Sequence, residues 1–347
     1  MINKKNLINL FIVFGFITNA LSQVNDSVIL DAKIPKKLSE FNFFTDLNLQ
    51  VPNEGVLPYD LINPLFSDYA DKLRFVYVPE NKRLGYSPDK VLDFPDGSVL
   101  IKTFAYLNDH PESKIDKQLL ETRLLIKKND AWKNVSYVWN EKQDDAYLSI
   151  AGKTINTAFV MEDGTERNVR YRVPNINQCK ECHQLNKEIQ PIGPKVRNLN
   201  HKFSYSDGTM NQIKKWQLME WIDSSDNYPT MANWSNEKND LDSRARAYLD
   251  INCGHCHIPG GSADTTGLYL NLKEDSNMHI GIYKKPVAAG RASNNLKYSI
   301  DPGNPSKSIL SFRMTSLDPG VMMPESGRSL NHKEGVELIE KWIKNMK

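Results

Sequence analysis

The 347-residue sequence lacks an excess of charge of one sign, since 44 Lys and Arg residues are set against 42 Asp and Glu residues. It has no long basic block, so the electrostatic footprint of a nucleic-acid-binding protein is absent. It also lacks the glycine and proline enrichment of collagen-like or low-complexity chains, with 18 residues of each. Its hydrophobic content of 40% is enough for folded cores, and its length predicts two or three domains.

Long apolar runs are absent beyond the N-terminus, so no membrane-spanning helix is expected in the mature protein. At the N-terminus, Lys4 and Lys5 precede an apolar run from Leu7 to Ile17, and small residues follow. This order is typical of a secretory signal peptide. We therefore predict that residues 1–22 are a signal, cleaved near Ser22-Gln23, and that the protein is exported to the periplasm.

Cysteine is scarce, and all four residues fall in two short motifs, Cys179-Lys180-Glu181-Cys182-His183 and Cys253-Gly254-His255-Cys256-His257. Both motifs have the C-x-x-C-H spacing of c-type haem attachment. In such a motif each thiol forms a thioether with one vinyl group of the porphyrin, and the histidine ligates the iron. The sequence predicts two covalently bound haem c groups, attached through Cys179, Cys182, Cys253 and Cys256, with His183 and His257 as iron ligands.

Other uses of the cysteines fit the spacing less well. A zinc ribbon separates its cysteine pairs by about 15–20 residues, whereas these pairs begin at positions 179 and 253. A thioredoxin-like C-x-x-C expects a βαβ context that the pattern does not show. Two disulfides, common in exported proteins, would leave the adjacent histidines unexplained. Within the second motif, we expect His255 to be an exposed spacer residue.

Between residues 71 and 173, short segments rich in β-branched and aromatic residues alternate with turn signals, which predicts strands. The segments are Leu73–Val78, Ser98–Tyr106, Leu119–Lys127, Val135–Trp139 and Val169–Val173. We predict a β-rich, sandwich-like domain over residues 23–173 that carries no cofactor. No catalytic constellation is evident in it, so a structural or docking role is the expectation.

From residue 174 onwards we predict a mainly α-helical haem-binding region, which makes the chain an α+β multidomain protein. Residues 174–235 would form the first haem-binding segment, and residues 236–347 a domain with the second haem. Apolar residues recur at helical spacing just before Cys253, and a final amphipathic helix follows Asn331, a good N-cap. This arrangement resembles a class I cytochrome c domain, in which the first and last helices pack beside the haem.

The loop of residues 319–327 contains Met323-Pro324. It resembles the loop that supplies the distal methionine in such cytochromes, and proline keeps the preceding residue extended. We expect Met323, ahead of Met322, to be the sixth iron ligand of the second haem. The sixth ligand of the first haem stays open, with these candidates: Met161, Met210, Met219, Met231, His201 or a vacant position.

Further segments resemble a family of exported bacterial dihaem c-type cytochromes whose role is poorly defined. They are residues 94–104 (FPDGSVLIKTF), residues 121–125 (ETRLL), residues 137–140 (YVWN), residues 244–249 (RARAYL), both haem motifs and Met323-Pro324. The resemblance covers most of the mature chain. It implies two haems, export and electron transfer, but no substrate.

The leading functional hypothesis is an electron carrier between periplasmic donor and acceptor proteins, which would meet it through small, transient interfaces. His/Met ligation of the second iron would raise its potential. The alternative is a dihaem peroxidase-like oxidoreductase with an open site at the first haem. A third possibility is a binding module in which the haems are only structural. Enzymatic activity is thus left open, and electron transfer is preferred.

Overall fold

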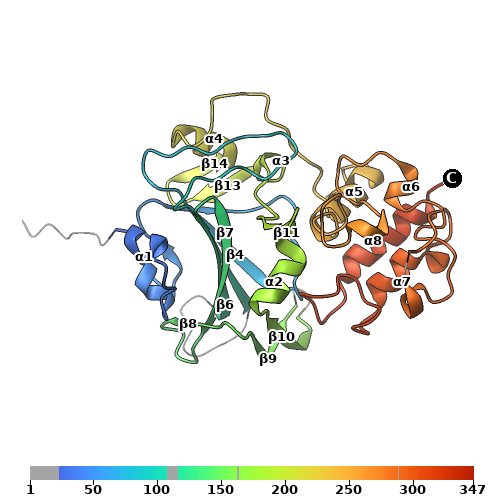
Figure 1. Ribbon diagram of the computed structural model, residues 1–347, viewed down its shortest axis with the longest axis horizontal. Coiled ribbons are helices and arrows are strands. Elements are labelled where there is room, and N and C mark those ends of the chain that lie inside the picture. The colour runs from blue at the N-terminus through green and yellow to red at the C-terminus, as the bar shows by residue number, and fades with distance from the viewer. Residues whose placement is uncertain (1–22, 108–115, 162–163, 288) are drawn as a thin grey trace, which may run out of the picture.

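The computed structural model describes residues 23–107, 116–161, 164–287 and 289–347. The predicted signal peptide lies outside these residues. A large antiparallel sheet forms one end of the molecule, and a group of helices formed by residues 241–347 lies at the other (Figure 1). No helix in the described ranges has the length and apolar character needed to cross a bilayer.

The main sheet has six strands that pair in sequence order, β3-β4-β5-β6-β7-β8. The strands are β3 Val56–Tyr59, β4 Asp71–Tyr77, β5 Val99–Leu107, β6 Lys117–Lys128, β7 Ala131–Trp139 and β8 Ala146–Leu148. Asn129 and Asp130 connect β6 to β7 and both have positive φ, as a two-residue hairpin turn requires. Four of the five predicted strand segments are thereby confirmed as neighbouring strands of this sheet.

The N-terminal segment covers one face of the sheet. It comprises α1 Asp26–Leu30, the 3-10 helix η1 Leu38–Phe41, and the paired strands β1 Phe44–Asp46 and β2 Val51–Pro52. Phe41 is fully buried and packs edge-on against Tyr137 of β7. The Tyr137 hydroxyl donates to the Pro35 carbonyl at 3.0 Å. This face is therefore an apolar core with few polar side chains.

Two separate apolar clusters occupy the opposite face. At one end, the hairpin of β9 Lys153–Val160 and β10 Glu166–Val173 packs against Phe104 and Tyr106 of β5. At the other end, Trp216 anchors a cluster built on β4 and β5. Its covering elements are α3 Val196–Leu199, β13 Lys202–Tyr205, β14 Gly208–Asn211 and α4 Gln212–Leu218. The helix α2 Ile176–His183 and strand β12 Glu188–Ile189, which pairs with β11 Gln184–Leu185, contact β7.

The C-terminal helices are held together by their own core. Tyr248 and Leu249 of α5 pack with Ile339 and Trp342 of the last helix, and the Trp342 indole donates to Asp242 at 2.8 Å. The elements are α5 Leu241–Asn252, η2 Asp264–Thr266, α6 Asn277–Ile280, η3 Gly290–Ser293, η4 Pro305–Lys307, α7 Ile309–Thr315 and α8 Lys333–Lys344. The helix predicted before Cys253 and the final helix are confirmed, although α8 is preceded by His332 rather than Asn331 at its N-cap.

A buried carboxylate joins the C-terminal part to the sheet. Asp68 accepts hydrogen bonds from the Ser329 backbone at 2.7 Å, the Ser329 hydroxyl at 2.8 Å and the Leu330 backbone at 2.8 Å. Close by, the Phe66 ring stacks on His332 with centroids 4.3 Å apart. These contacts place the segment between the predicted methionine loop and α8 against the start of β4.

The predicted fold class is wrong. Helix accounts for only 23% of the described residues, and the region of the C-x-x-C-H motifs contains the β11-β12 and β13-β14 hairpins rather than a mainly helical, cytochrome c-like fold. The β-rich part is built on one six-stranded sheet, and only the short β9-β10 hairpin packs across part of its face, so it is not a sandwich of two large sheets. Short polar-apolar alternations such as Lys202–Tyr205 are too brief to distinguish from loop in the sequence, and they become strands because a neighbour pairs with them.

Candidate functional site

The first C-x-x-C-H motif forms the last turn of α2. Asn175 caps this helix by accepting from the Gln178 backbone, and the Gln178 side chain accepts in return from the Asn175 backbone. The β11-β12 hairpin then folds back, so that Gln190 N donates to the His183 carbonyl at 2.7 Å. The Nδ1 atom of His183 lies 2.8 Å from the Gln190 carbonyl oxygen. The imidazole is thus held by the hairpin that follows it.

The second motif follows the end of α5 and repeats this arrangement. Cys253 is the C-cap of α5, and His257 N donates to the Cys253 carbonyl at 2.9 Å, which makes the motif a helical turn. Leu270 N donates to the His257 carbonyl at 2.8 Å. His257 Nδ1 lies 3.2 Å from the Leu268 carbonyl oxygen. A following segment therefore orients this imidazole too.

The hydrogen bonds decide the tautomer of both histidines. A carbonyl oxygen can only accept, so Nδ1 carries the proton in His183 and in His257. Burial, and secondly the charge of Lys102, lower the pKa of His183 to about 4; burial likewise lowers the pKa of His257 to about 4. Both rings are neutral at pH 7, and Nε2 of each makes no hydrogen bond to the described residues. A lone pair on Nε2, with Nδ1 held by a carbonyl, is the state of a histidine that ligates a metal.

The structure brings the two motifs into contact. Sγ of Cys182, a ring nitrogen of His255 and Sγ of Cys256 all lie within 4.8 Å of one another. The Cys256 thiol donates to the Glu181 carbonyl at 3.3 Å. Next to it, Asn186 N donates to the Gly260 carbonyl at 2.8 Å. The segments after both motifs therefore run side by side, although they lie far apart in the sequence.

The expectation for His255 was wrong. The residue is half-buried rather than exposed, and its Nδ1 atom is buried without a hydrogen-bond partner among the described residues. It also faces the Cys182 thiol, and the neighbouring Cys256 and His255 side chains hold the pKa of that thiol well below its ordinary value. Position within the motif gave no signal for this contact, because the contact depends on where the first motif lies in space.

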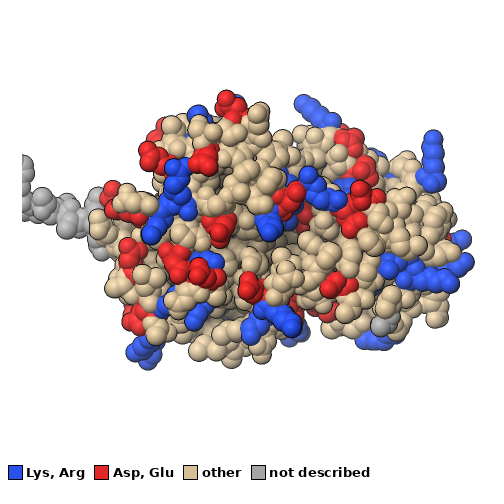
Figure 2. Space-filling view, turned by 45° about the horizontal axis from the view of Figure 1, so that its top comes forward, with Lys and Arg blue, Asp and Glu red and all other residues tan. Residues whose placement is uncertain are grey.

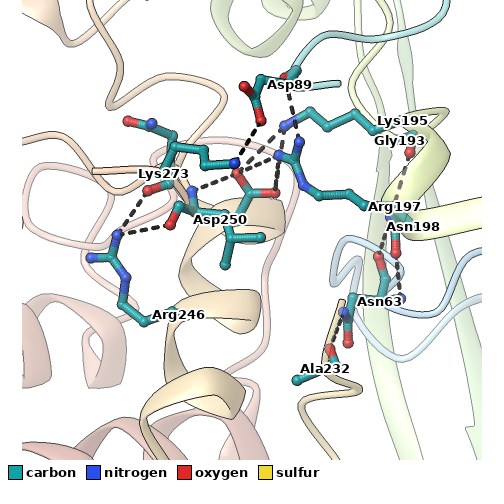
Figure 3. A network of polar contacts seen from close by, with 12 residues as sticks. Asn63, Asp89, Gly193, Lys195, Arg197, Asn198, Ala232, Arg246, Asp250 and Lys273 are labelled. Carbon is teal, nitrogen blue, oxygen red and sulfur yellow. Dashed lines mark hydrogen bonds and ion pairs between the residues drawn. The ribbon is translucent and has the colours of Figure 1, made fainter. Parts of the chain in front are cut away.

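A buried ion network joins α5, which precedes the second motif, to α3, which follows the first motif (Figure 3). Asp250 of α5 lies three residues before Cys253 and is 2% exposed. It accepts from Arg197 Nη2 at 3.1 Å, from Lys195 Nζ at 3.5 Å and from the Leu272 backbone at 3.0 Å. Burial alone would raise the pKa of Asp250, but Lys195 and Arg197 hold it below its ordinary value. The helix that carries the second motif is thereby anchored to α3, downstream of the first.

The loop that carries Met323 reaches the paired motifs. Ser326 Oγ lies 3.8 Å from Cys182 Sγ. Met323 N donates to the Arg313 carbonyl at 2.9 Å, and the Arg313 charge is among those that lower the pKa of His257. Met322 is buried, whereas Met323 is half-buried. None of these contacts tests the preference for Met323, which stays a prediction.

The candidates for the sixth iron ligand of the predicted first haem lie in different parts of the fold. Met210 and Met219 pack with the Trp216 cluster, and Met161 packs beside the β9-β10 hairpin. His201 and Met231 line a cavity of about 550 Å³, whose walls include neither cysteine of the first motif nor His183.

Comparison of the chain with protein-family models, with curated proteins and with solved structures found no match in any of the three.

Proposed function

We propose that this protein is an exported dihaem c-type electron-transfer protein. The observation that carries the proposal is the state of the two histidines: both are neutral, both present Nε2 without a hydrogen bond, and each follows a C-x-x-C pair in a helical turn. This donor set fits two haem c groups, with a thioether at each cysteine and an imidazole at each iron. The bound groups would supply one-electron chemistry.

The chain's own residues perform the remaining tasks. The Gln190 and Leu268 carbonyls orient the two imidazoles and increase their basicity as ligands. The contact between Cys182 and Cys256 makes the two attachment sites neighbours, which favours electron passage between them. On the face in view, positive and negative side chains are interspersed (Figure 2), which suits a brief encounter with a redox partner better than a strongly steered one.

The cluster of Cys182, His255 and Cys256 supports a second candidate, a single thiolate-rich metal site. Two thiols and an imidazole match three of the four ligands of a structural zinc ion. The two candidates exclude each other, because a cysteine held in a thioether bond cannot supply a thiolate to zinc.

Production of the exported chain in a host that matures c-type cytochromes separates the candidates. We expect two covalent haems per chain by pyridine haemochrome, one after C179A/C182A, one after C253A/C256A, and two after His255→Ala. A matched control is His279→Ala, since His279 is an exposed histidine outside both motifs. A colourless chain with one zinc, lost on His255→Ala, would overturn the proposal in favour of the metal site. Two low-spin irons without peroxide turnover support electron transfer; a high-spin iron with fast turnover supports the peroxidase alternative.

A further inference from the structure

Residues 277–317 carry a local excess of positive charge. This stretch contains one carboxylate, Asp301, and no glutamate. The chain as a whole is balanced, with 44 Lys and Arg residues against 42 Asp and Glu residues. The cations of the stretch are Lys284, Lys285, Arg291, Lys297, Lys307 and Arg313. Such an imbalance within a nearly neutral protein is a local source of positive potential.

Backbone hydrogen bonds bring three segments of this stretch together at the surface. Ser299 N donates to the Lys284 carbonyl at 2.7 Å, and Ile309 N donates to the Tyr298 carbonyl at 3.1 Å. The segments at 283–285, 297–299 and 307–309 therefore lie side by side. We call their exposed and half-buried aromatic and basic residues the lysine patch: Tyr283, Lys284, Lys285, Lys297, Tyr298 and Lys307.

The charges of the lysine patch are not compensated within the described part of the chain. The two arginines of the stretch are paired, Arg291 with Asp318 at 2.6 Å and Arg313 with Glu325 at 3.8 Å. By contrast, none of the four lysines of the patch forms an ion pair with a described residue. Asp301, the one carboxylate of the stretch, is half-buried. The four ammonium groups are thus available to the carboxylates of another molecule.

The lysine patch has an aromatic centre. Tyr283 is 53% exposed, and its ring packs edge-on against Tyr298 with centroids 5.4 Å apart. Lys297 Nζ lies 4.9 Å from the centroid of the Tyr298 ring. An aromatic centre with a charged rim is the usual composition of a protein–protein interface. Because the two rings hold each other in place, the surface is preformed, which favours a protein partner over insertion into a lipid surface.

The lysine patch adjoins the segment that orients the imidazole of the second motif. Gly281 packs so closely on Leu268 that an added Cβ atom would lie 2.9 Å from Leu268 Cδ1. The Leu268 carbonyl oxygen is the one that lies 3.2 Å from His257 Nδ1. Next to it, Tyr269 N donates to the His279 carbonyl at 2.8 Å. A molecule bound to the patch therefore lies beside the elements that hold the second motif.

We propose that the lysine patch is the docking surface for an acidic redox protein that exchanges one electron with the second haem. No bond forms or breaks in this exchange. The inference rests on the proposed function and adds the charge of the partner and the haem that it meets. Because the chain as a whole is nearly neutral, the patch acts within about a Debye length of ~10 Å, and it orients the partner rather than attracting it from afar.

The first experiment measures binding of a plant-type ferredoxin, a small acidic redox protein, to the oxidised holoprotein by calorimetry. We expect Lys284→Gln/Lys297→Gln to weaken binding about tenfold at low salt and little at high salt, because exposed charges are screened. Tyr283→Ser should weaken binding at both salt concentrations. The matched control is Lys33→Gln/Lys36→Gln, which removes the same charge from two exposed lysines of the N-terminal segment. A loss no larger than that of the control overturns the proposal.

The second experiment locates the haem that receives the electron. Reduced ferredoxin is mixed in a stopped-flow instrument with the C179A/C182A chain, which would carry only the second haem. We expect Lys284→Gln/Lys297→Gln to lower the second-order rate of its reduction about tenfold. The same substitutions in the C253A/C256A chain, which would carry only the first haem, should leave the rate unchanged. An equal loss in both chains would overturn the assignment to the second haem.

A lipid surface is the other macromolecule that lysines and tyrosines can bind. Sedimentation of the holoprotein with phosphatidylglycerol vesicles tests it, and we expect the protein to stay in solution. Vesicle binding that is lost in Lys284→Gln/Lys297→Gln would overturn the assignment to a protein partner. Failure of the proposed function is distinct from all these results, because the wild-type chain would then carry no haem by pyridine haemochrome.

Discussion

The most specific prediction concerns Asp250, whose ion pairs with Lys195 and Arg197 hold α5 against α3. Asp250→Asn removes the carboxylate while keeping a side chain of nearly the same shape, so packing changes little. It leaves Arg197, which is 4% exposed, as a buried cation and Lys195 as a half-buried one, both without their anion. The hydrogen bond from Leu272 N can persist through the amide oxygen. The substitution thus isolates the ionic part of the network.

The expected cost is large for a single substitution. Removal of one partner of a buried ion pair typically destabilises a protein by about 3–5 kcal/mol, because the remaining charge stays desolvated. We therefore expect the free energy of unfolding, measured by urea titration, to fall by about that amount. The control is Asp318→Asn, which breaks a two-pronged pair with Arg291 at the surface and should have a far smaller effect.

The pH dependence gives an independent check. The pKa of Asp250 is depressed in the folded protein, so its contribution is present above the unfolded value of 3.8 and is lost as pH falls through the folded value. Wild-type stability should therefore decline more steeply below about pH 4 than that of Asp250→Asn. Equal acid dependence of the two proteins, or a loss no greater than that of Asp318→Asn, would refute the reasoning.

Three further predictions concern other parts of the chain. Met323→Ala should abolish the methionine–iron spectral signature of one haem only, whereas Met322→Ala, at a buried position, should lower stability by about 2–5 kcal/mol without that spectral change. Trp342→Ala should destabilise the packing of α5 on α8 by about 3–5 kcal/mol in urea titrations. Asp130→Gly, at a turn position with φ of 58°, should raise the unfolding free energy by about 0.5–1 kcal/mol.

Several elements were predictable because their signals are local. The strands β4 to β7 alternate or cluster apolar residues between turn residues, and the stripe Val336, Ile339, Trp342 and Ile343 marks the buried face of α8. The start of α8 was displaced by one residue because His332, stacked on Phe66, occupies the cap position that Asn331 was expected to take. Contacts with remote segments decide such boundaries.

By itself, the sequence determined which residues form each motif and predicted their chemistry, since two cysteines and a histidine at fixed spacing need no distant partner to be recognised. Only the tertiary structure decided that Cys182 meets Cys256, that Asp250 joins Arg197, and that Tyr283 packs on Tyr298. Each of these pairs residues from different segments of the chain, and which strands and helices become neighbours is set by cooperative packing of the whole core. A one-dimensional pattern carries no record of that choice.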